Sequence, residues 1–331
     1  MYTRRRFFLP QFILIFFLIF SAAAVPTARG QSENEEPPAP VSRSLQRQLA
    51  TSDEAVSFLV ILRDQLDIEA ALDAAPVDLS DRTVRATYLY DRLTAHAQST
   101  QANLRTVLAQ EGVTARSFYI VNMLEVEGNA ALAARLRSHP AVARLEANPT
   151  ISQAHLAALA APAGPVWLAR VIQPWLQDTS LATEENARVT TVEQPWGLAY
   201  TGAPELWANG ITGAEIVVAS QDTGVQWDHP ALQSRYRGWD GEGDTVDHVY
   251  NWYDAWAAGS RPASCDSDPQ TPCDDHGHGT HTVGTMLGNA TGDEPVLGMA
   301  PDATWIGCRN MENGDGTPAS YTACFEFFLA P

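Results

Sequence analysis

The sequence predicts an α/β fold, a doubly wound parallel sheet, preceded by a smaller α+β domain. Residues 215–220 (EIVVAS) form the short apolar run of a parallel strand buried on both faces. Residues 278–288 (HGTHTVGTMLG) carry apolar side chains at helical spacing, and residues 303–308 (ATWIGC) are a second short strand. A crossover of this kind makes the two strands parallel. Upstream, residues 55–152 show strand and helix patterns of their own.

The smaller domain is predicted from five segments that alternate strand, helix, strand, helix and strand. The long helix repeats apolar residues every three to five positions, and the second strand alternates apolar and polar residues up to Gly128. Asn129 caps the short helix that Pro140 ends. This order is that of a split β-α-β, ferredoxin-like unit, which also suits a stand-alone regulatory or binding domain. The segments are 57–64, 81–111, 117–128, 129–140 and 141–152.

The N-terminus has the pattern of a secretory signal peptide over residues 1–30. Arg4–Arg6 precede an apolar run over 12–25, and small residues suited to cleavage follow. The alternative is an uncleaved anchor, but the run is shorter than the about 20 residues of a full span. TRRRFF also resembles a twin-arginine export signal. We therefore expect a secreted, extracellular protein without a stable membrane anchor.

Changes in composition along the rest of the chain predict a linker, two domains and a connector between them. Residues 31–52 are rich in Glu, Pro, Ser and Gln and predict a solvated linker before a domain over 53–153. Residues 154–189 are an Ala-rich, then acidic, connector with a short helix near 166–176. The second domain covers 190–331, where APELWANG predicts a helix that ends at a glycine.

Charge and cysteine content limit the classes of partner. The net charge of −18 argues against nucleic acid, because phosphate binding needs clustered Lys and Arg. The four cysteines lie in the last quarter, and in an exported chain an even number favours disulfides. Proximity favours Cys265–Cys273 and Cys308–Cys324 among the three pairings, with reduced buried thiols as the alternative. The spacings are not those of a CxxC metal site.

The residues that carry chemistry are Asp222 and His278. Asp222 follows a buried strand directly, and open α/β sheets place functional residues at the carboxyl ends of their strands. His278 lies in the first turn of the next predicted helix, where flanking glycines leave the backbone room. A carboxylate that orients an imidazole leaves the second ring nitrogen free to act as a general base.

The same residues and their neighbours allow other interpretations. A metal cluster is disfavoured because H-x-H-x-x-H is not the H-E-x-x-H pattern of zinc proteases. An aspartic protease would need a second Asp-Thr/Ser-Gly and an all-β chain. We expect His281 to be packed beneath the helix, His276 to be exposed and His229 to have a structural role in a turn. The metal candidates were His276, His278 and His281 with Asp274 and Asp275.

Three segments resemble the subtilisin-like (subtilase) serine proteases over about 190–331. They are VVASQDTGV, HGHGTHTVGTMLG and VLGMAPDATW, in which Asp precedes His as in the subtilisin arrangement. WIGCRNM with CFEFFLAP is most similar to the bacillopeptidase F-like branch. Residues 55–152 resemble the inhibitor-type propeptide of these proteases, notably at HPAVARLEANPTIS.

The resemblance implies that Asp222 is the triad aspartate and His278 the triad base of an endopeptidase acting on polypeptides. The nucleophilic serine and the oxyanion asparagine would follow later, and neither Ser220 nor Ser320 has a nucleophile context. We therefore expect a precursor cut short, inactive by the triad mechanism as it stands. The alternative is a catalytically dead fragment that acts as a propeptide-type inhibitor or folding helper.

No cofactor is predicted, and calcium has no specific motif. The HPDL segment that supplies a calcium-binding aspartate in many subtilisins is HPAL here, with Ala231 at the aspartate position. The acidic loop 265–275 (CDSDPQTPCDD) offers carboxylates, but it lacks an EF-hand pattern and a solvated loop is favoured.

Overall fold

The computed structural model describes residues 37–52, 54–152, 194–241, 245–256, 265, 268–289 and 296–330. Residues 38–331 group into one compact unit, separate from residues 1–37. The predicted signal peptide and the short helix near 166–176 lie outside the described residues. Within the described part of the chain, no helix has both the length and the apolar character needed to cross a membrane.

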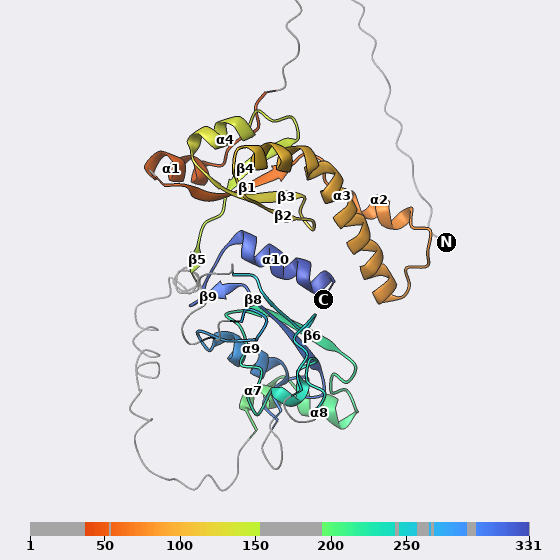
Figure 1. Ribbon diagram of the computed structural model, residues 1–331. Helices are drawn as coiled ribbons and strands as arrows, with labels where there is room; N and C mark the ends of the chain where they lie inside the picture. The colour runs from red at the N-terminus through yellow and green to blue at the C-terminus, as the bar shows by residue number, and fades with distance from the viewer. Residues whose placement is uncertain are drawn as a thin grey trace, which may run out of the picture. The chain divides into compact units, whose positions relative to one another are not determined.

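The first group of elements is a four-stranded antiparallel sheet with its helices (Figure 1). The strands lie in the order β2-β3-β1-β4. The domain is thus α+β and ferredoxin-like as expected, with one strand more than the sequence predicts. Asp81 and Asn129 cap α3 and α4 through their side chains, because each supplies the oxygen that the first helical N–H groups lack. The elements are β1 (Val56–Leu62), α2 (Ile68–Asp73), α3 (Arg82–Gln110), β2 (Ala115–Phe118), β3 (Met123–Gly128), α4 (Ala130–Leu136) and β4 (Val142–Ala147).

The two faces of this sheet are buried against different partners. In β1, Phe58, Val60 and Leu62 point into a core shared with α3 and α4. The alternate residues Leu59 and Ile61 point the opposite way, as the period of two in a strand requires. A sheet that is apolar on both faces needs a second layer, and α10 (Pro318–Leu329) supplies it.

Three boundaries differ from the sequence predictions. The expected solvated linker 31–52 is wrong for α1 (Arg43–Thr51), because Ser42 caps this helix and Leu45 is fully buried in the core. The single strand expected over 117–128 is two strands, β2 and β3, that form a hairpin. The last strand expected over 141–152 is also divided, since β4 stays in the first sheet whereas β5 (Ile151–Ser152) joins another.

The second group contains the predicted parallel sheet, with strand order β6-β8-β7. The strands are β6 (Val217–Asp222), β7 (Trp252–Asp254) and β8 (Thr304–Arg309), preceded by helices α7 (Trp196–Tyr200) and α8 (Ala203–Ala208). α9 (His278–Leu287) and α10 lie on opposite sides of the strands (Figure 1). In β8, Trp305 packs with the α9 side and Cys308 with the α10 side, so both faces of this strand are covered.

The position of β6 corrects one prediction. The run 215–220 was expected to be a central strand buried on both faces, but the strand begins at Val217, its first half is exposed or half-buried, and only Ser220 and Asp222 are buried. Among the described residues β6 pairs only with β8, so it is an edge strand of this sheet. The expected parallel pairing and the end of the strand at Asp222 are both confirmed.

The cysteines are paired as proximity predicted. Cys265 bonds to Cys273, with Cα atoms 5.6 Å apart, and Cys308 bonds to Cys324, with Cα atoms 5.7 Å apart. The second bond joins β8 to α10 inside the core, where both cysteines are almost fully buried. It therefore fixes the helix that also packs against the first sheet.

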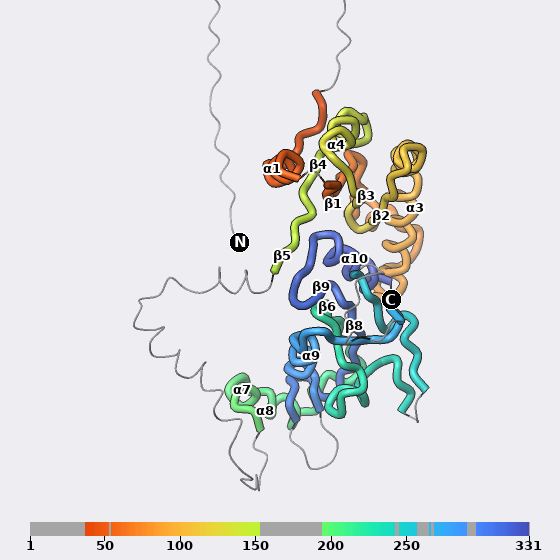
Figure 2. Tube along the Cα trace, turned by 60° about the vertical axis from the view of Figure 1, so that its left-hand side comes forward, coloured from red at the N-terminus to blue at the C-terminus, as the bar shows by residue number. Residues whose placement is uncertain are grey.

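A third, small sheet joins the two groups in the order β5-β10-β9. β9 (Met311–Glu312) and β10 (Asp315–Gly316) form a hairpin, and β5 adds to it antiparallel, with Ile151 opposite Gly316. The chain runs from β4 straight to this hairpin (Figure 2). The end of the smaller domain is thus held as an added strand on the larger one.

One pH effect follows from the packing of His139. Burial lowers the pKa of His139 below its ordinary value of 6.5, and its Nδ1 accepts a hydrogen bond from the Ala141 N–H at 3.2 Å. The folded state therefore favours the neutral ring, so this contribution to stability is present above pH 6.5 and is lost as pH falls through the lowered pKa. Urea unfolding of the full 331-residue chain should show stability falling with acidification through this range, and less so in His139→Gln. An identical pH slope in the variant would contradict this account.

Candidate active site

Asp222 and His278 meet at the carboxyl edge of the parallel sheet. Asp222 is the last residue of β6 and His278 the first of α9. The Nδ1 atom of His278 lies 2.7 Å from Oδ1 of Asp222. The Asp222 side chain is 11% exposed and that of His278 41%. The carboxylate is thus enclosed, and the imidazole it holds stays open to a reacting group.

Other hydrogen bonds fix the Asp222 carboxylate. Oδ1 also accepts from the Thr223 N–H at 2.7 Å, and Oδ2 accepts from Thr282 Oγ1 at 3.3 Å. The single hydroxyl hydrogen of Thr282 is shared between this Oδ2 and the carbonyl of His278, which lies 2.9 Å away, one turn earlier in α9. The carboxylate is therefore held by its own loop and by the helix that carries its histidine.

Glycines permit this close approach. A Cβ atom on Gly279 would collide with the carbonyl oxygen of Gly224 and crowd Asp222. Gly224 has a φ of +113°, and a Cβ there would meet the carbonyl of Cys273. The two segments can pack this tightly only because neither position carries a side chain.

Asp274 connects the same two segments. Its carboxylate accepts hydrogen bonds from Thr223 Oγ1 at 2.8 Å, from the Gly277 N–H at 2.8 Å and from the Thr280 N–H at 2.8 Å. Burial on its own raises the pKa of Asp274, but the hydrogen bonds from Thr280, Gly277 and Thr223 outweigh it and lower the pKa. The carboxylate is consequently held ionised.

Arg309 carries a buried charge cluster at the end of β8. It contacts both oxygens of Asp254 at 3.0 Å and lies 2.9 Å from Asp275 Oδ2. The three side chains are 0 to 1% exposed, and Glu312 approaches Arg309 at 3.6 Å. Asp275 Oδ1 also accepts from the Asn313 N–H at 3.1 Å in the β9–β10 turn. The loop before His278 is thus tied to the hairpin that binds β5.

The remaining histidines have structural or peripheral positions. His276 is exposed as predicted, with its ring centroid 6.4 Å from that of His278. His229 accepts from the Ala231 N–H at 3.2 Å in its turn, as predicted. The expectation of a packed His281 is wrong: this side chain is exposed, because it lies on the outer face of α9, away from the buried Val283 and Leu287.

The two serines and the two aspartates among the candidate metal ligands are buried or hydrogen-bonded to other parts of the protein. Ser220 is buried, and Ser320 Oγ donates to the Asn310 carbonyl at 2.7 Å at the start of α10. Within the part of the chain that the structure describes, no three His, Cys, Asp or Glu side chains converge on a metal position. Asp274 and Asp275 are instead engaged by the α9 N-terminus and by Arg309. Part of the acidic loop 265–275 lies outside the described residues.

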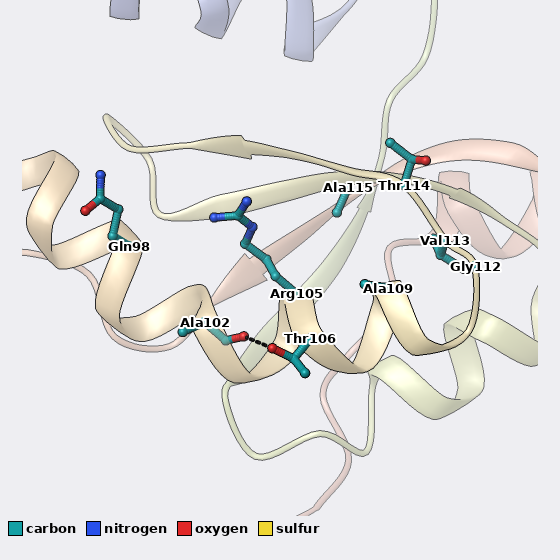
Figure 3. A pocket seen from close by; sticks show the side chains of 9 residues that line it. All are labelled: Gln98, Ala102, Arg105, Thr106, Ala109, Gly112, Val113, Thr114 and Ala115. Atoms are coloured by element: carbon teal, nitrogen blue, oxygen red, sulfur yellow. Dashed lines mark hydrogen bonds between the residues drawn. The ribbon is translucent and has the colours of Figure 1, made fainter.

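The hollow in Figure 3 lies beside α3 and β2 and has a volume of about 650 Å³. Arg105 is its only charged side chain, and the single hydrogen bond drawn runs from Thr106 Oγ1 to the Ala102 carbonyl at 2.9 Å. Another hollow of about 860 Å³ flanks α9 and is lined mainly by small and apolar residues. Neither hollow contains Asp222 or His278.

Sequence reasoning found the Asp–His pair but not its supports. Thr223 and Thr280 belong to the quoted DTG and HGTH segments, so their positions were visible although their hydroxyl contacts were not. Asp274 was considered only as a metal ligand; the signal for its actual contacts is an acidic residue just before a helix start. Arg309 carries a different signal, since a basic residue at the end of an apolar strand requires buried acidic partners.

The structure thus has an Asp–His pair at the carboxyl edge of a parallel α/β sheet. The family model of the subtilases (Peptidase S8) matches residues 213–326 of this chain. The match includes both Asp222 and His278 and ends within α10.

The curated relatives agree with this family. Bacillopeptidase F of Bacillus subtilis (strain 168) is 39% identical over 137 residues, which are 41% of this chain and 9% of that protein. The minor extracellular protease Vpr of the same organism is 36% identical over 38% of this chain and 14% of its own length. Its major intracellular serine protease is 33% identical over 38% and 33%. The chain thus spans a third or less of these relatives.

A solved structure is also similar in part. It is a serine protease from Staphylococcus aureus that processes the epidermin leader peptide. The TM-score is 0.46 at 12% identity, over 78% of this chain and 44% of that one.

The buried charge cluster gives a stability prediction. Arg309→Met would leave the Asp254 and Asp275 carboxylates buried without their cation, which costs about 3–5 kcal/mol of unfolding free energy. Arg235→Met is the matched control, because its partner Asp302 is 41% exposed and such pairs contribute about 0–1 kcal/mol. Chemical denaturation of the two variants measures both values. Equal losses in the two variants would show that the cluster has no special role.

Proposed function

We propose that this chain is the N-terminal part of a secreted serine endopeptidase precursor that cleaves peptide bonds. The observation that carries the proposal is the 2.7 Å contact between His278 Nδ1 and Asp222 Oδ1 at the edge of a parallel sheet. The subtilase match over the same residues supports a serine protease. The third member of the triad is a serine that we assign to sequence beyond residue 331.

In this mechanism His278 removes the proton from the serine hydroxyl as the oxygen attacks the scissile carbonyl carbon. The proton then passes to the leaving amine, and water repeats the cycle on the acyl-enzyme. Asp222 keeps the Nδ1–H tautomer of His278 and stabilises the imidazolium as it forms. The enclosure of Asp222 supports this role, because an ion pair is stronger where water is excluded.

We further propose that the smaller domain is the propeptide of this protease. Its sheet packs through Leu59, Ile61, Phe118 and Met123 on the α10 side of the larger domain. The Glu326 carboxylate of α10 accepts from the backbone N–H groups of Tyr119 and Ile120, and burial raises its pKa. β5 then lies on β10 as an extended peptide would, which is β-strand addition.

Export is the remaining part of the proposal. The signal peptide pattern over residues 1–30 supports secretion. The relatives include proteins named as extracellular and as intracellular, so kinship alone does not decide the compartment. No cofactor is part of the proposal, since Ala231 replaces the calcium-binding aspartate of the HPDL segment.

The triad assignment predicts a selective loss of activity. In the complete protein, His278→Ala removes the base and should lower kcat/KM for a peptide substrate by about 10⁴-fold or more. His281→Ala is the matched control: it lies on the same helix but faces outward, so activity should change by less than about tenfold. Hydrolysis of a chromogenic peptide measures both. Full activity in His278→Ala would refute the assignment.

The second candidate function, inhibition without catalysis, is favoured by the addition of β5 to β10. Purified segment 37–152 should inhibit an active subtilase, and a version ending at residue 147 should inhibit at least about tenfold less, because it lacks β5. Inhibition constants measured at several concentrations provide the comparison. If neither segment inhibits at micromolar concentration, the propeptide and inhibitor roles both fail. Equal inhibition by the two would exclude β5 as the binding strand.

A further inference from the structure

We propose that Asp274 is a positioning residue for His278: its side chain fixes the first turn of α9 against the end of β6 and so sets the contact between His278 and Asp222. Asp274 touches no reacting atom and acts through the backbone that carries the histidine. The inference rests on the proposed role of His278 as the base. Its test reads the geometry of the ring and not turnover.

The carboxylate collects donors from both sides of the dyad. Oδ1 accepts from Thr223 Oγ1 at 2.8 Å, from the His276 N–H at 3.1 Å and from the Gly277 N–H at 2.8 Å. Oδ2 accepts from the Thr280 N–H at 2.8 Å and from its Oγ1 at 2.5 Å. One donor adjoins Asp222 and the others surround His278.

The hydroxyls of Thr223 and Thr280 also connect the two segments that carry Asp222 and His278, each by accepting a hydrogen bond from the opposite segment. Thr223, on the β6 side, accepts through Oγ1 from the Gly279 N–H of α9 at 3.0 Å. Thr280, on the α9 side, accepts through Oγ1 from the Gln226 N–H of the β6 loop at 3.0 Å. Each hydroxyl donates to Asp274 and accepts from the other segment. The Asp274 carboxylate therefore takes part in two connections between the β6 loop and α9, one through Thr223 and one through Thr280.

These hydrogen bonds require that both side-chain terminal atoms of residue 274 act as acceptors. A carboxylate has no hydrogens and about four lone-pair positions, whereas asparagine places two N–H donors at one of the two positions. In Asp274→Asn the amide would face either the Thr280 donors or those of Thr223 and Gly277. α9 has no cap from its own N-cap residue, Gly277, whose φ is +85°. Its first turn therefore depends on Asp274 for satisfied N–H groups.

Asp275, the next residue, has different partners from Asp274, so the two aspartates can be tested separately. Asp275 turns the opposite way and binds Arg309 and the Asn313 N–H. The two consecutive aspartates thus hold two different structures, the dyad and the charge cluster. Loss of the Asp274 contacts should therefore disturb the His278 ring before it disturbs the sheet.

The experiment is NMR on the full 331-residue chain with ¹⁵N-labelled histidine. Wild type should show a downfield Nδ1 proton and the Nδ1–H tautomer for His278, assigned by their loss in His278→Gln. In Asp274→Asn this proton signal should be lost and the ring should become a tautomer mixture, while the amide spectrum keeps its dispersion. Asp302→Asn, an equal charge change in the same domain, should leave the signal intact.

A second pair of variants covers the case in which Asp274→Asn does not fold. Thr280→Val removes one hydroxyl link and should weaken the His278 signal, whereas Thr280→Ser keeps the hydroxyl and should retain it. An unchanged signal in folded Asp274→Asn, or equal signals in the two Thr280 variants, would overturn the proposal. Absence of the signal in folded wild type would instead refute the Asp222–His278 pair, and with it the proposed function.

Discussion

The packing of α9 directly onto the end of β6 is the constraint on which the rest of the site depends. It brings together Asp222 and His278, which are 56 residues apart in the chain. The approach is possible only with glycine at 224 and 279, since a Cβ at either position would meet backbone. Backbone brought this close must have its polar groups satisfied. The hydroxyls of Thr223 and Thr280 and the carboxylate of Asp274 meet that requirement.

A second set of contacts connects this edge to the smaller domain. The loop before His278 is anchored through Asp275 to Arg309 and to the β9–β10 turn, and β10 carries β5. α10 is anchored to β8 by the Cys308–Cys324 bond and packs against the four-stranded sheet. The surfaces that hold the smaller domain are therefore continuous, through covalent and buried ionic contacts, with the residues around the dyad.

The helices and strands that the sequence predicts correctly are those whose patterns lie within the element itself. Helices α3, α4 and α9 have apolar periodicity, and α3 and α4 also have side-chain N-caps. The parallel pairing of β6 with β8 follows from crossover geometry. Sequence reasoning failed where tertiary contacts decide the outcome. Residues 43–51 have the composition of a linker but form a helix, because Leu45 is buried in the core of the smaller domain. β5 pairs with β10 and not with the sheet that contains β4. The positions of Asp222 and His278 were predictable, whereas the particular partners of Asp274 and Arg309 lie on other segments of the chain, which local spacing does not identify.

The most direct test of the account is covalent labelling of the complete protein with a fluorophosphonate, followed by mass spectrometry of the labelled peptide. Such probes react with a serine whose hydroxyl is activated by a neighbouring base. The account predicts one labelled serine beyond residue 331, with labelling reduced by about 10³-fold or more in His278→Ala. Labelling that does not depend on His278, or no labelling of the folded and processed protein, would contradict it.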